Sequence, residues 1–320
     1  MCIRDRNTPV NLPPVLPDTA PALVNPLRLD QDDLRHFKER GFIKLRGLLT
    51  PAAILQLREL ANSQLRPAPS GTSAHGEGFS RLTHRVTQVG ILERLYRQPA
   101  FAQVLTRLSG CRLIMSEAQS FELGVGRSGF AWHYDSLNFR YIRPQDLAFS
   151  LWMPLQPIRP EVQGGGMAWV PLSQFSAQEN FQFSRLLAGK LARGESVAEF
   201  SAHLHQTYCT PGMLTDSFEA QRIEDSFEPG DALLFSKYLW HRSSPLLAGD
   251  LERRQAVTLR LLDWRACLDP LMQEGETRSA GGLGMGLDGG PLNPVSYGSR
   301  FVDITPGAPI RSSVHCGPIL

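Results

Sequence analysis

The first 110 residues alternate between helical and extended patterns of hydrophobic positions. Residues 30–41 (DQDDLRHFKERG) place leucine and phenylalanine at helical spacing between a capping aspartate and a closing glycine. FIKL at 42–45 then alternates as a strand does. Thr50 and Pro51 supply an N-cap and a first helical position, and residues 91–109 are again helical in pattern. The pattern predicts helices on both sides of a short strand.

Beyond residue 110 the pattern changes to short apolar runs separated by glycine or proline. The five runs are CRLIMSEAQSFEL at 111–123, LAFSLWMPL at 147–155, GGGMAWVPL at 164–172, DALLFSKYLW at 231–240 and RRQAVTLRLLDW at 253–264. Their residues favour strands, and several strands in succession favour a sandwich or barrel over alternating βα units. We therefore predict a mainly β protein with flanking helices, of the α+β class.

The long segments between and around the strands set the expected domain organisation. Residues 173–228 are polar, partly helical in pattern and long enough to form a lid. Residues 1–26 are rich in proline without an apolar period, which predicts a flexible leader, and MCIRDR at 1–6 is unlike the rest and is interpreted as non-native. Residues 27–320 are expected to form a single domain that contains this insertion.

Composition narrows the classes of partner. The 320-residue chain has 33 basic and 31 acidic residues, and a net charge of +2 indicates neither a nucleic-acid nor a membrane partner. No run approaches the roughly 18 apolar residues of a membrane span. The odd number of widely spaced cysteines predicts free thiols and a cytoplasmic location. They are Cys2, Cys111, Cys209, Cys267 and Cys316.

The sequence FAWHYDSLNF at 130–139 contains the first candidate chemistry. On a strand, His133 and Asp135 would project from the same face, so an imidazole and a carboxylate could meet at one point. His241 follows an apolar strand and could supply a third ligand. Two histidines and one carboxylate on one face of an octahedron are the ligand set of non-haem Fe(II) oxygenases.

The His-x-Asp motif could also arise by chance, and the other histidines illustrate this. Roughly 0.4 chance matches to His-x-Asp are expected in a chain of this composition. His75 and Glu77 have a similar form within a polar loop, and His203 and His205 lie in the expected lid. The remaining three have no companion at ligand spacing: His36, His84 and His315.

An arginine near the start of the last strand strengthens the interpretation. PGDALLFSKYLWHRSSP at 229–245 brings His241 to the end of one run, and Arg254 stands near the beginning of the next. A guanidinium fork suits the far end of a dicarboxylate cosubstrate. Without His241, an exposed edge arginine would be the simpler explanation.

Taken together, these segments resemble the phytanoyl-CoA dioxygenase family of Fe(II)- and 2-oxoglutarate-dependent oxygenases, over roughly residues 30–265. The similarity rests on five ordered segments, DLRHFKERGFIKLRGLLTPAAILQLREL, AWHYDS, SLWMPLQP, GGGMAWVPLSQ and PGDALLFSKYLWHRSSP. The resemblance implies a double-stranded β-helix, a cupin-like jelly roll, with N-terminal helices packed on one sheet and a lid insertion.

The resemblance also implies roles for individual residues. His133, Asp135 and His241 would bind iron, and Arg254 would pair with the distal carboxylate of 2-oxoglutarate. Arg254 is preferred to Arg253 because it stands in the family's position relative to the following QAVT. Three further residues match positions near the cosubstrate: Ser243, Trp152 and Gln119.

The chain departs from the family pattern at two places. Pro171-Leu172-Ser173-Gln174 replaces the usual turn after the glycine-rich strand, and Arg242 follows the distal histidine where relatives often have glycine. Halogenating relatives replace the carboxylate ligand by a small residue, so Asp135 favours oxygen chemistry. The implied reaction uses dioxygen, converts 2-oxoglutarate to succinate and carbon dioxide, and removes a hydrogen atom from a C–H bond.

Residues 136–146 (SLNFRYIRPQD) follow the ligands and indicate where a substrate could lie. With one arginine of the last strand, they would suit a small-molecule substrate bearing a carboxylate or phosphate. The candidate contacts are Asn138, Arg140, Tyr141, Arg143 and Arg260.

Two alternatives remain open from the sequence. A zinc-dependent hydrolase or isomerase on a cupin-like barrel could use the same three ligands. It would give Arg254 no evident partner. A non-catalytic barrel that retains the pocket would bind a ligand without turnover of a cosubstrate.

Overall fold

Two antiparallel β-sheets form the centre of the molecule. The computed structural model describes residues 21–68, 78–83, 86, 90–139, 141–195, 211–272 and 305–311. The large sheet has seven strands in the order β1-β8-β5-β10-β4-β3-β2, and the small sheet has the order β7-β6-β9. The strands are β1 Phe42–Leu45, β2 Arg66–Pro67, β3 Arg81–Thr83, β4 Leu113–Gly124, β5 Ala148–Pro154, β6 Met167–Val170, β7 Ile223–Glu224, β8 Ala232–Ser236, β9 Trp240–Ser243 and β10 Arg253–Asp263.

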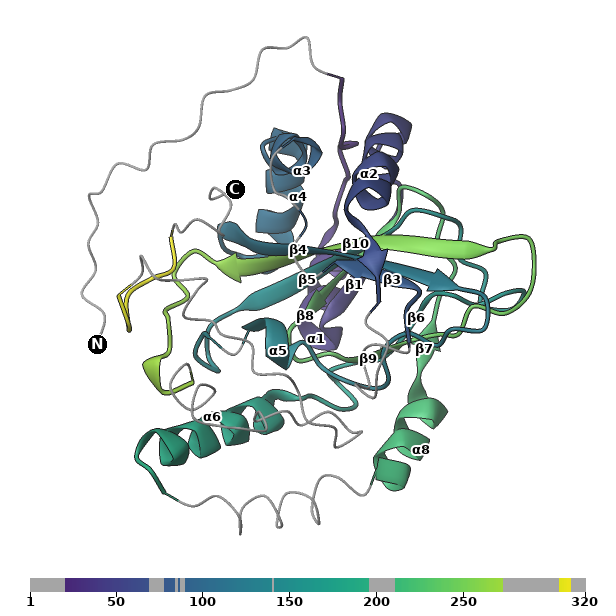
Figure 1. Ribbon diagram of the computed structural model, residues 1–320. Helices are drawn as coiled ribbons and strands as arrows, with labels where there is room; N and C mark the ends of the chain where they lie inside the picture. The colour runs from purple at the N-terminus through teal and green to yellow at the C-terminus, as the bar shows by residue number, and fades with distance from the viewer. Residues whose placement is uncertain are drawn as a thin grey trace.

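Helices cover one face of the large sheet, as Figure 1 shows for α2, α3 and α4. The described helices are α1 Gln31–Arg40, α2 Pro51–Gln64, α3 Ile91–Tyr96, α4 Pro99–Ser109, α5 Ser136–Phe139, α6 Gln178–Ala192 and α8 Pro211–Gln221. Asp30 and Asp33 form a reciprocal capping box on α1, and Gly41 ends it in the left-handed region at φ 76°. The first two predicted helices are thus confirmed.

The helix expected over residues 91–109 is in fact two helices. Arg97 and Gln98 separate α3 from α4, and Pro99 is the first residue of α4. Proline has no backbone N–H to continue a helix, but its fixed φ suits the start of a new one. The continuous hydrophobic pattern hid this break.

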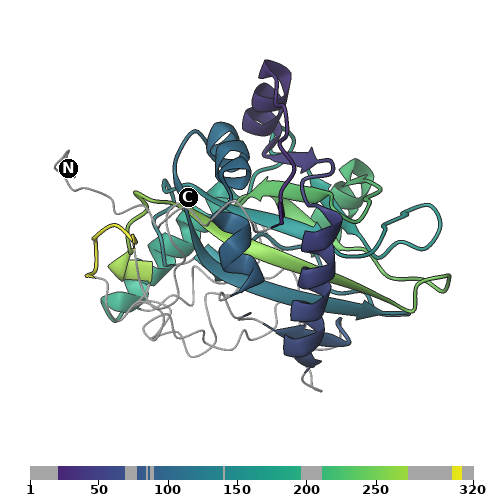
Figure 2. The ribbon, with the colours of Figure 1, turned by 90° about the horizontal axis from the view of Figure 1, so that it is seen from above.

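Strand β10 divides the interior into two chemically different layers. Val257, Leu259 and Leu261 belong to the apolar core beneath the helices. Successive side chains of a strand alternate between faces, so Arg254 and Arg260 lie on the opposite face, toward the small sheet. The sheet therefore packs its helices on one side and presents polar groups on the other. Seen from above, helices α2 and α4 lie in front of the large sheet and cross its strands (Figure 2).

The run DALLFSKYLW was expected to be one strand and instead contributes to two. Residues 232–236 form β8 in the large sheet, a turn closes with the Leu239 N–H donating to the Ser236 carbonyl, and β9 begins at Trp240 in the small sheet. His241 therefore lies within a strand and does not merely follow one. The exchange of the chain between sheets belongs to the double-stranded β-helix, which confirms the predicted fold.

The chain outside the β core differs in part from expectation. Leu23 and Val24 are buried, and both of their N–H groups donate to the Gln98 side chain, so packing begins before residue 27. Residues 1–20 lie outside the described part. The segment at 173–228 contains α6, α8 and β7, with 196–210 undescribed, and residues 305–311 pack beside the end of β10. Among the described helices, none is long and apolar enough to cross a membrane.

Candidate metal centre

His133, Asp135 and His241 come together between the two sheets. The expectation that His133 and Asp135 share a regular strand is wrong, because only His133 makes a β-bridge and helix α5 begins directly after Asp135. The bridge partner of His133 is His241, and the two residues exchange both backbone hydrogen bonds at 2.9 Å. Backbone pairing thus sets the two histidines side by side.

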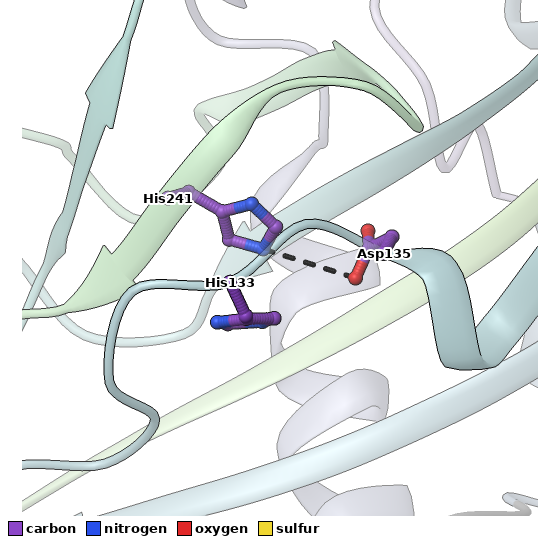
Figure 3. Close-up of side chains that lie close together, drawn as sticks. All are labelled: His133, Asp135 and His241. Carbon is purple, nitrogen blue, oxygen red and sulfur yellow. Dashed lines mark ion pairs between the residues drawn. The ribbon is translucent and has the colours of Figure 1, made fainter. Parts of the chain in front are cut away.

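The three side chains converge on one point (Figure 3). One potential ligand atom from each residue lies within 4.8 Å of the others. The His241 Nε2 and Asp135 Oδ1 atoms are 3.8 Å apart, and the imidazole centroids are separated by 4.2 Å. Among the described residues this is the group of histidine, cysteine and acidic side chains that could hold a metal ion.

Both imidazoles are held in a tautomer suited to metal binding. The Nδ1 atom of His133 lies 2.7 Å from the Ala131 carbonyl oxygen, and that of His241 lies 2.9 Å from the Leu239 carbonyl oxygen. A carbonyl only accepts, so each Nδ1 carries the proton and the lone pair resides on Nε2. This is the common arrangement of metal-ligating histidines.

Burial and charge act in opposite directions at these ligands. Burial by itself would raise the pKa of Asp135, but Arg260 foremost, followed by the two histidines and Ser150, leaves that pKa below its usual value. Burial lowers the pKa of His241 despite the opposing effect of Asp135. A carboxylate and a neutral imidazole are the states that coordinate metals.

A cavity opens beside the three ligand residues and encloses about 400 Å³, including the space at its mouth. Its lining is largely aromatic, with a few polar groups from β9 and β10. It is formed by Phe79, Phe121, Phe130, His133, Trp152, Met167, Phe235, His241, Ser243, Arg254, Thr258 and Arg260.

Arg254 brings a buried positive charge to this cavity. Its Nε donates to the Gly165 carbonyl, and its guanidinium lies 5.5 Å from the centroid of the Trp152 indole. Burial lowers the pKa of Arg254 to about 9, and no acidic side chain of the described residues offsets that effect. Arg253, by contrast, is exposed. A buried cation without an anionic partner is costly and indicates a place for an anionic ligand.

The other predicted cosubstrate residues fall into two groups. Ser243 and Trp152 line the cavity, and the Ser243 hydroxyl accepts from the Phe130 N–H at 3.2 Å. Gln119 is buried and accepts a hydrogen bond from Arg260 while donating to Asn138. Gln119 therefore holds Arg260, which in turn binds Asp135, and it is not among the residues that line the cavity.

The predicted substrate contacts are mostly engaged elsewhere. Tyr141 packs in an apolar cluster, and the Arg143 guanidinium forms an ion pair with Asp146. Arg260 lines the cavity, but its guanidinium forms an ion pair with Asp135. Asn138 also donates a hydrogen bond to Asp135. Arg140 lies outside the described residues. Among the described candidates, the charges of Arg143 and Arg260 are therefore already paired within the protein.

Two contributors to the site escaped sequence reasoning. Ser150 donates to Asp135, and its signal was a serine in an apolar strand, two residues before Trp152 and so on the same face. Glu219, from the insertion, accepts from the Trp132 indole at 2.8 Å and pairs with Arg242. No pattern in the sequence connects Glu219 to residues so distant along the chain.

The remaining features singled out in the sequence are the other histidines and the Pro171–Gln174 segment. His36 is exposed on α1, and the other candidate histidines lie outside the described residues. At the unusual Pro171-Leu172-Ser173-Gln174 segment, the Gln174 N–H donates to the Pro171 carbonyl and closes a turn. This departure therefore preserves a turn after β6.

The donor set fits iron. Two neutral imidazoles and one carboxylate, on one side of an open cavity, match the facial arrangement of non-haem Fe(II) sites. A thiolate, which would favour zinc or an iron–sulfur cluster, is not among these ligands.

Comparison with solved structures gives the same fold. SnoK, a non-haem α-ketoglutarate-dependent carbocyclase from nogalamycin biosynthesis, is 15% identical with a TM-score of 0.59, over 91% of this chain and 96% of its own. The epimerase SnoN of the same pathway is 15% identical with a TM-score of 0.55, over 90% and 97%. EctD from S. alaskensis, with 2-oxoglutarate and 5-hydroxyectoine, is 15% identical with a TM-score of 0.51, over 88% of each chain.

Comparison with protein-family models identifies the family of the chain, whereas the solved structures show only its fold. No curated protein sequence matches significantly. The model of the family "Phytanoyl-CoA dioxygenase (PhyH)" matches residues 37–255, which is more than half of the chain and includes all three candidate metal ligands together with Arg254. The resemblance seen in the sequence is thereby confirmed, and with it the cofactor pair of iron and 2-oxoglutarate. The chain belongs to the phytanoyl-CoA dioxygenase family of Fe(II)- and 2-oxoglutarate-dependent enzymes.

Proposed function

We propose that this protein oxidises a small-molecule substrate at a C–H bond, using dioxygen and converting 2-oxoglutarate to succinate and carbon dioxide. Hydroxylation is the proposed outcome. In this proposal His133, Asp135 and His241 hold the iron, and Arg254 binds the distal carboxylate of 2-oxoglutarate.

The position of Arg254 carries the proposal. Its guanidinium lines the same cavity as the two histidines, and the described residues provide it with no acidic partner. A dicarboxylate with one end at the metal and the other at Arg254 would supply the missing charge. A zinc hydrolase would leave this buried cation unexplained.

Each residue of the site has a definable task. Trp152 packs against the Arg254 guanidinium, and Gly165 accepts from its Nε, so the fork is aimed before the cosubstrate arrives. Ser243 places a hydroxyl on the same wall. The aromatic lining would disfavour water around a bound cosubstrate, which would strengthen the charge interaction at Arg254. Bound iron and 2-oxoglutarate would supply, with dioxygen, an oxidant able to abstract hydrogen.

Asp135 supports oxidation over halogenation. The carboxylate is present and directed at His241, so the position that halogenating relatives leave open is filled. Abstraction of hydrogen also begins other oxidative outcomes, and solved structures with this fold include an epimerase and a carbocyclase. Hydroxylation is the simplest outcome that needs no further group.

The substrate is proposed to be a small molecule with an apolar portion near the iron. The cavity wall beside His133 is formed by phenylalanines, among them Phe79, Phe121 and Phe130. The proposed carboxylate of the substrate has no support among the described residues, since Arg143 and Arg260 are already paired.

Calorimetric titration of cobalt(II)-loaded protein tests the role of Arg254. We expect wild type to bind 2-oxoglutarate more tightly than 2-oxobutyrate, which lacks the distal carboxylate. Arg254→Met should weaken binding of 2-oxoglutarate by roughly 30-fold or more, because loss of one partner of a buried charge pair costs about 2 kcal/mol or more. Binding of 2-oxobutyrate should change far less.

The exposed neighbour provides the matched control. Arg253→Gln should leave both affinities unchanged, since Arg253 lies on the other face of β10. If Arg254→Met retained the wild-type preference for the dicarboxylate, the assignment of Arg254 would be wrong.

A further inference from the structure

The carboxylate of Asp135 is enclosed by a closed set of hydrogen bonds. Arg260 Nη1 donates to Asp135 Oδ2, and Arg260 Nη2 donates to Gln119 Oε1 at 2.8 Å. Gln119 Nε2 donates to Asn138 Oδ1 at 3.0 Å, and Asn138 Nδ2 returns to Asp135 Oδ1 at 3.3 Å. We refer to Asp135, Arg260, Gln119 and Asn138 as the hydrogen-bond ring.

The direction of every bond in this ring is determined by its charged members. Arginine can only donate and a carboxylate can only accept. Gln119 must therefore offer its carbonyl oxygen to Arg260 and its amide to Asn138, which in turn donates to Asp135. No member can reverse its role without breaking a bond, so the ring has one hydrogen-bonded arrangement.

The large sheet fixes the ring rigidly. Arg260 on β10 is paired in register with Ser150 on β5, and Thr258, two residues earlier, is paired with Gln119 on β4. Arg260, Gln119 and Ser150 are each at most 4% exposed. Three adjacent central strands thus hold Arg260 and Ser150, which donate to Asp135, and Gln119, which accepts from Arg260. Asp135 itself lies in an irregular segment.

The two carboxylate oxygens of Asp135 accept hydrogen bonds from different donors. Oδ2 receives bonds from both Arg260 and Ser150, and these two donors also bond to each other. Oδ1 has the longer contact with Asn138 and is the oxygen that faces His241 Nε2. Two donors, one of them a guanidinium, thus hold Oδ2, whereas Oδ1 is the oxygen that faces His241.

We propose that Arg260 is a positioning residue, which with Gln119, Asn138 and Ser150 makes Asp135 a one-oxygen metal ligand. This inference rests on the proposed metal site. Occupation of Oδ2 leaves Oδ1 alone for the metal, so more coordination positions stay open for 2-oxoglutarate and dioxygen. Arg260, which the sequence suggested as a substrate contact, acts through Asp135 instead.

If Arg260 only neutralises the charge of Asp135, the expected change in metal affinity on its removal is the opposite. If Arg260 only neutralised Asp135 in the metal-free protein, it would compete with the metal, and its removal would strengthen metal binding. If it orients the carboxylate, its removal should weaken metal binding, typically by on the order of 10- to 100-fold. Because Arg260 also lowers the pKa of Asp135, the direction of the change separates the two roles when binding is measured over a range of pH, up to values at which the affinity no longer rises as Asp135 ionises.

Titration of metal-free protein with cobalt(II), followed by the visible d–d absorption, measures both affinity and coordination. We expect Arg260→Met to bind cobalt more weakly by the factor above, with a changed spectrum as Asp135 turns to offer both oxygens. Gln119→Leu, which keeps the charge of Arg260 but removes its acceptor, should change both readouts in the same direction and less. Arg260→Lys should not restore them, because lysine lacks the fork.

Controls separate the possible failures. Arg253→Gln should match wild type, and His133→Ala should lose most of the cobalt binding. Loss of binding in His133→Ala, with wild-type affinity and spectrum in Arg260→Met, would overturn the positioning role alone. Wild-type binding in His133→Ala would overturn the metal site itself. If Arg260→Met does not fold, Gln119→Leu decides, and a wild-type spectrum and affinity in that variant would contradict the proposal.

Discussion

At the scale of single residues, the same local bond orients both histidines. Each imidazole donates its Nδ1 proton to the carbonyl two residues earlier, Ala131 for His133 and Leu239 for His241. The bond that selects each tautomer is therefore local in the sequence. Only the pairing of the segments is a long-range event.

Lys237 is a second residue whose state depends on its surroundings. It is buried in the turn between β8 and β9, donates to the Arg143 carbonyl at 3.1 Å and the Asp146 carbonyl at 2.6 Å, and lies 4.6 Å from the Phe181 ring centroid. Burial lowers the pKa of Lys237 to about 7, although Asp146 opposes the shift.

This shift predicts a pH dependence of stability. Between the folded value near 7 and the ordinary value of 10.5, the unfolded chain binds more protons at this lysine, so its contribution to stability rises with pH. Relative to Lys237→Met, wild type should gain about 2 to 3 kcal/mol of unfolding free energy from pH 7 to pH 9. Urea denaturation of both proteins at the two pH values measures the difference. A difference that is constant with pH would contradict the assignment.

At the scale of elements, helix α8 of the insertion is hydrogen-bonded to both segments that carry the candidate histidine ligands. Glu219 accepts from the Trp132 indole, next to His133, and from the Arg242 guanidinium, next to His241. Arg242 also lies 5.4 Å from the Trp132 ring centroid. Hydrogen bonding to Arg242 is the largest influence on the pKa of Glu219, which is lowered. The cation that departed from the family pattern therefore anchors the insertion.

Loss of this anchor should loosen α8. Glu219→Ala removes hydrogen bonds to a charged group, each typically worth about 1.5 to 3 kcal/mol, so amide hydrogen exchange in residues 214–221 should accelerate about tenfold or more. Mass spectrometry of exchanged peptides measures this rate. Glu179→Gln on α6, where the side chain is exposed, is the matched control. Equal protection of α8 in wild type and Glu219→Ala would contradict the anchor.

At the scale of the whole molecule, local signals in the sequence predicted more than long-range ones. Caps at Asp30 and Thr50 and the apolar runs predicted the elements, and the family motifs predicted the fold and the three residues that the structure brings together as candidate metal ligands. The sequence did not reveal that β8 and β9 belong to different sheets, because Ser236 and Lys237 are a short polar interruption that an exposed face of a single strand could also carry. In the structure the turn between the two strands contains Lys237, which is buried.

The partners of charged residues were equally hidden. Arg143 and Arg260 look alike in the sequence, yet one pairs with Asp146 in its own loop and the other with Asp135 from a distant segment. Strand register decides the second pairing, and register depends on contacts across the whole sheet. This is why the sequence could not show that, among the described candidates, Arg143 and Arg260 are already paired within the protein.

The central claim is that His133, Asp135, His241 and Arg254 form one site for iron and 2-oxoglutarate. Anaerobic addition of Fe(II) and then 2-oxoglutarate to metal-free protein tests it directly, through the visible charge-transfer absorption of an iron–oxoacid chelate. We predict a band in wild type that is lost in His133→Ala and that requires far more 2-oxoglutarate in Arg254→Met. Well-folded, iron-loaded wild-type protein that develops no such band would contradict the account.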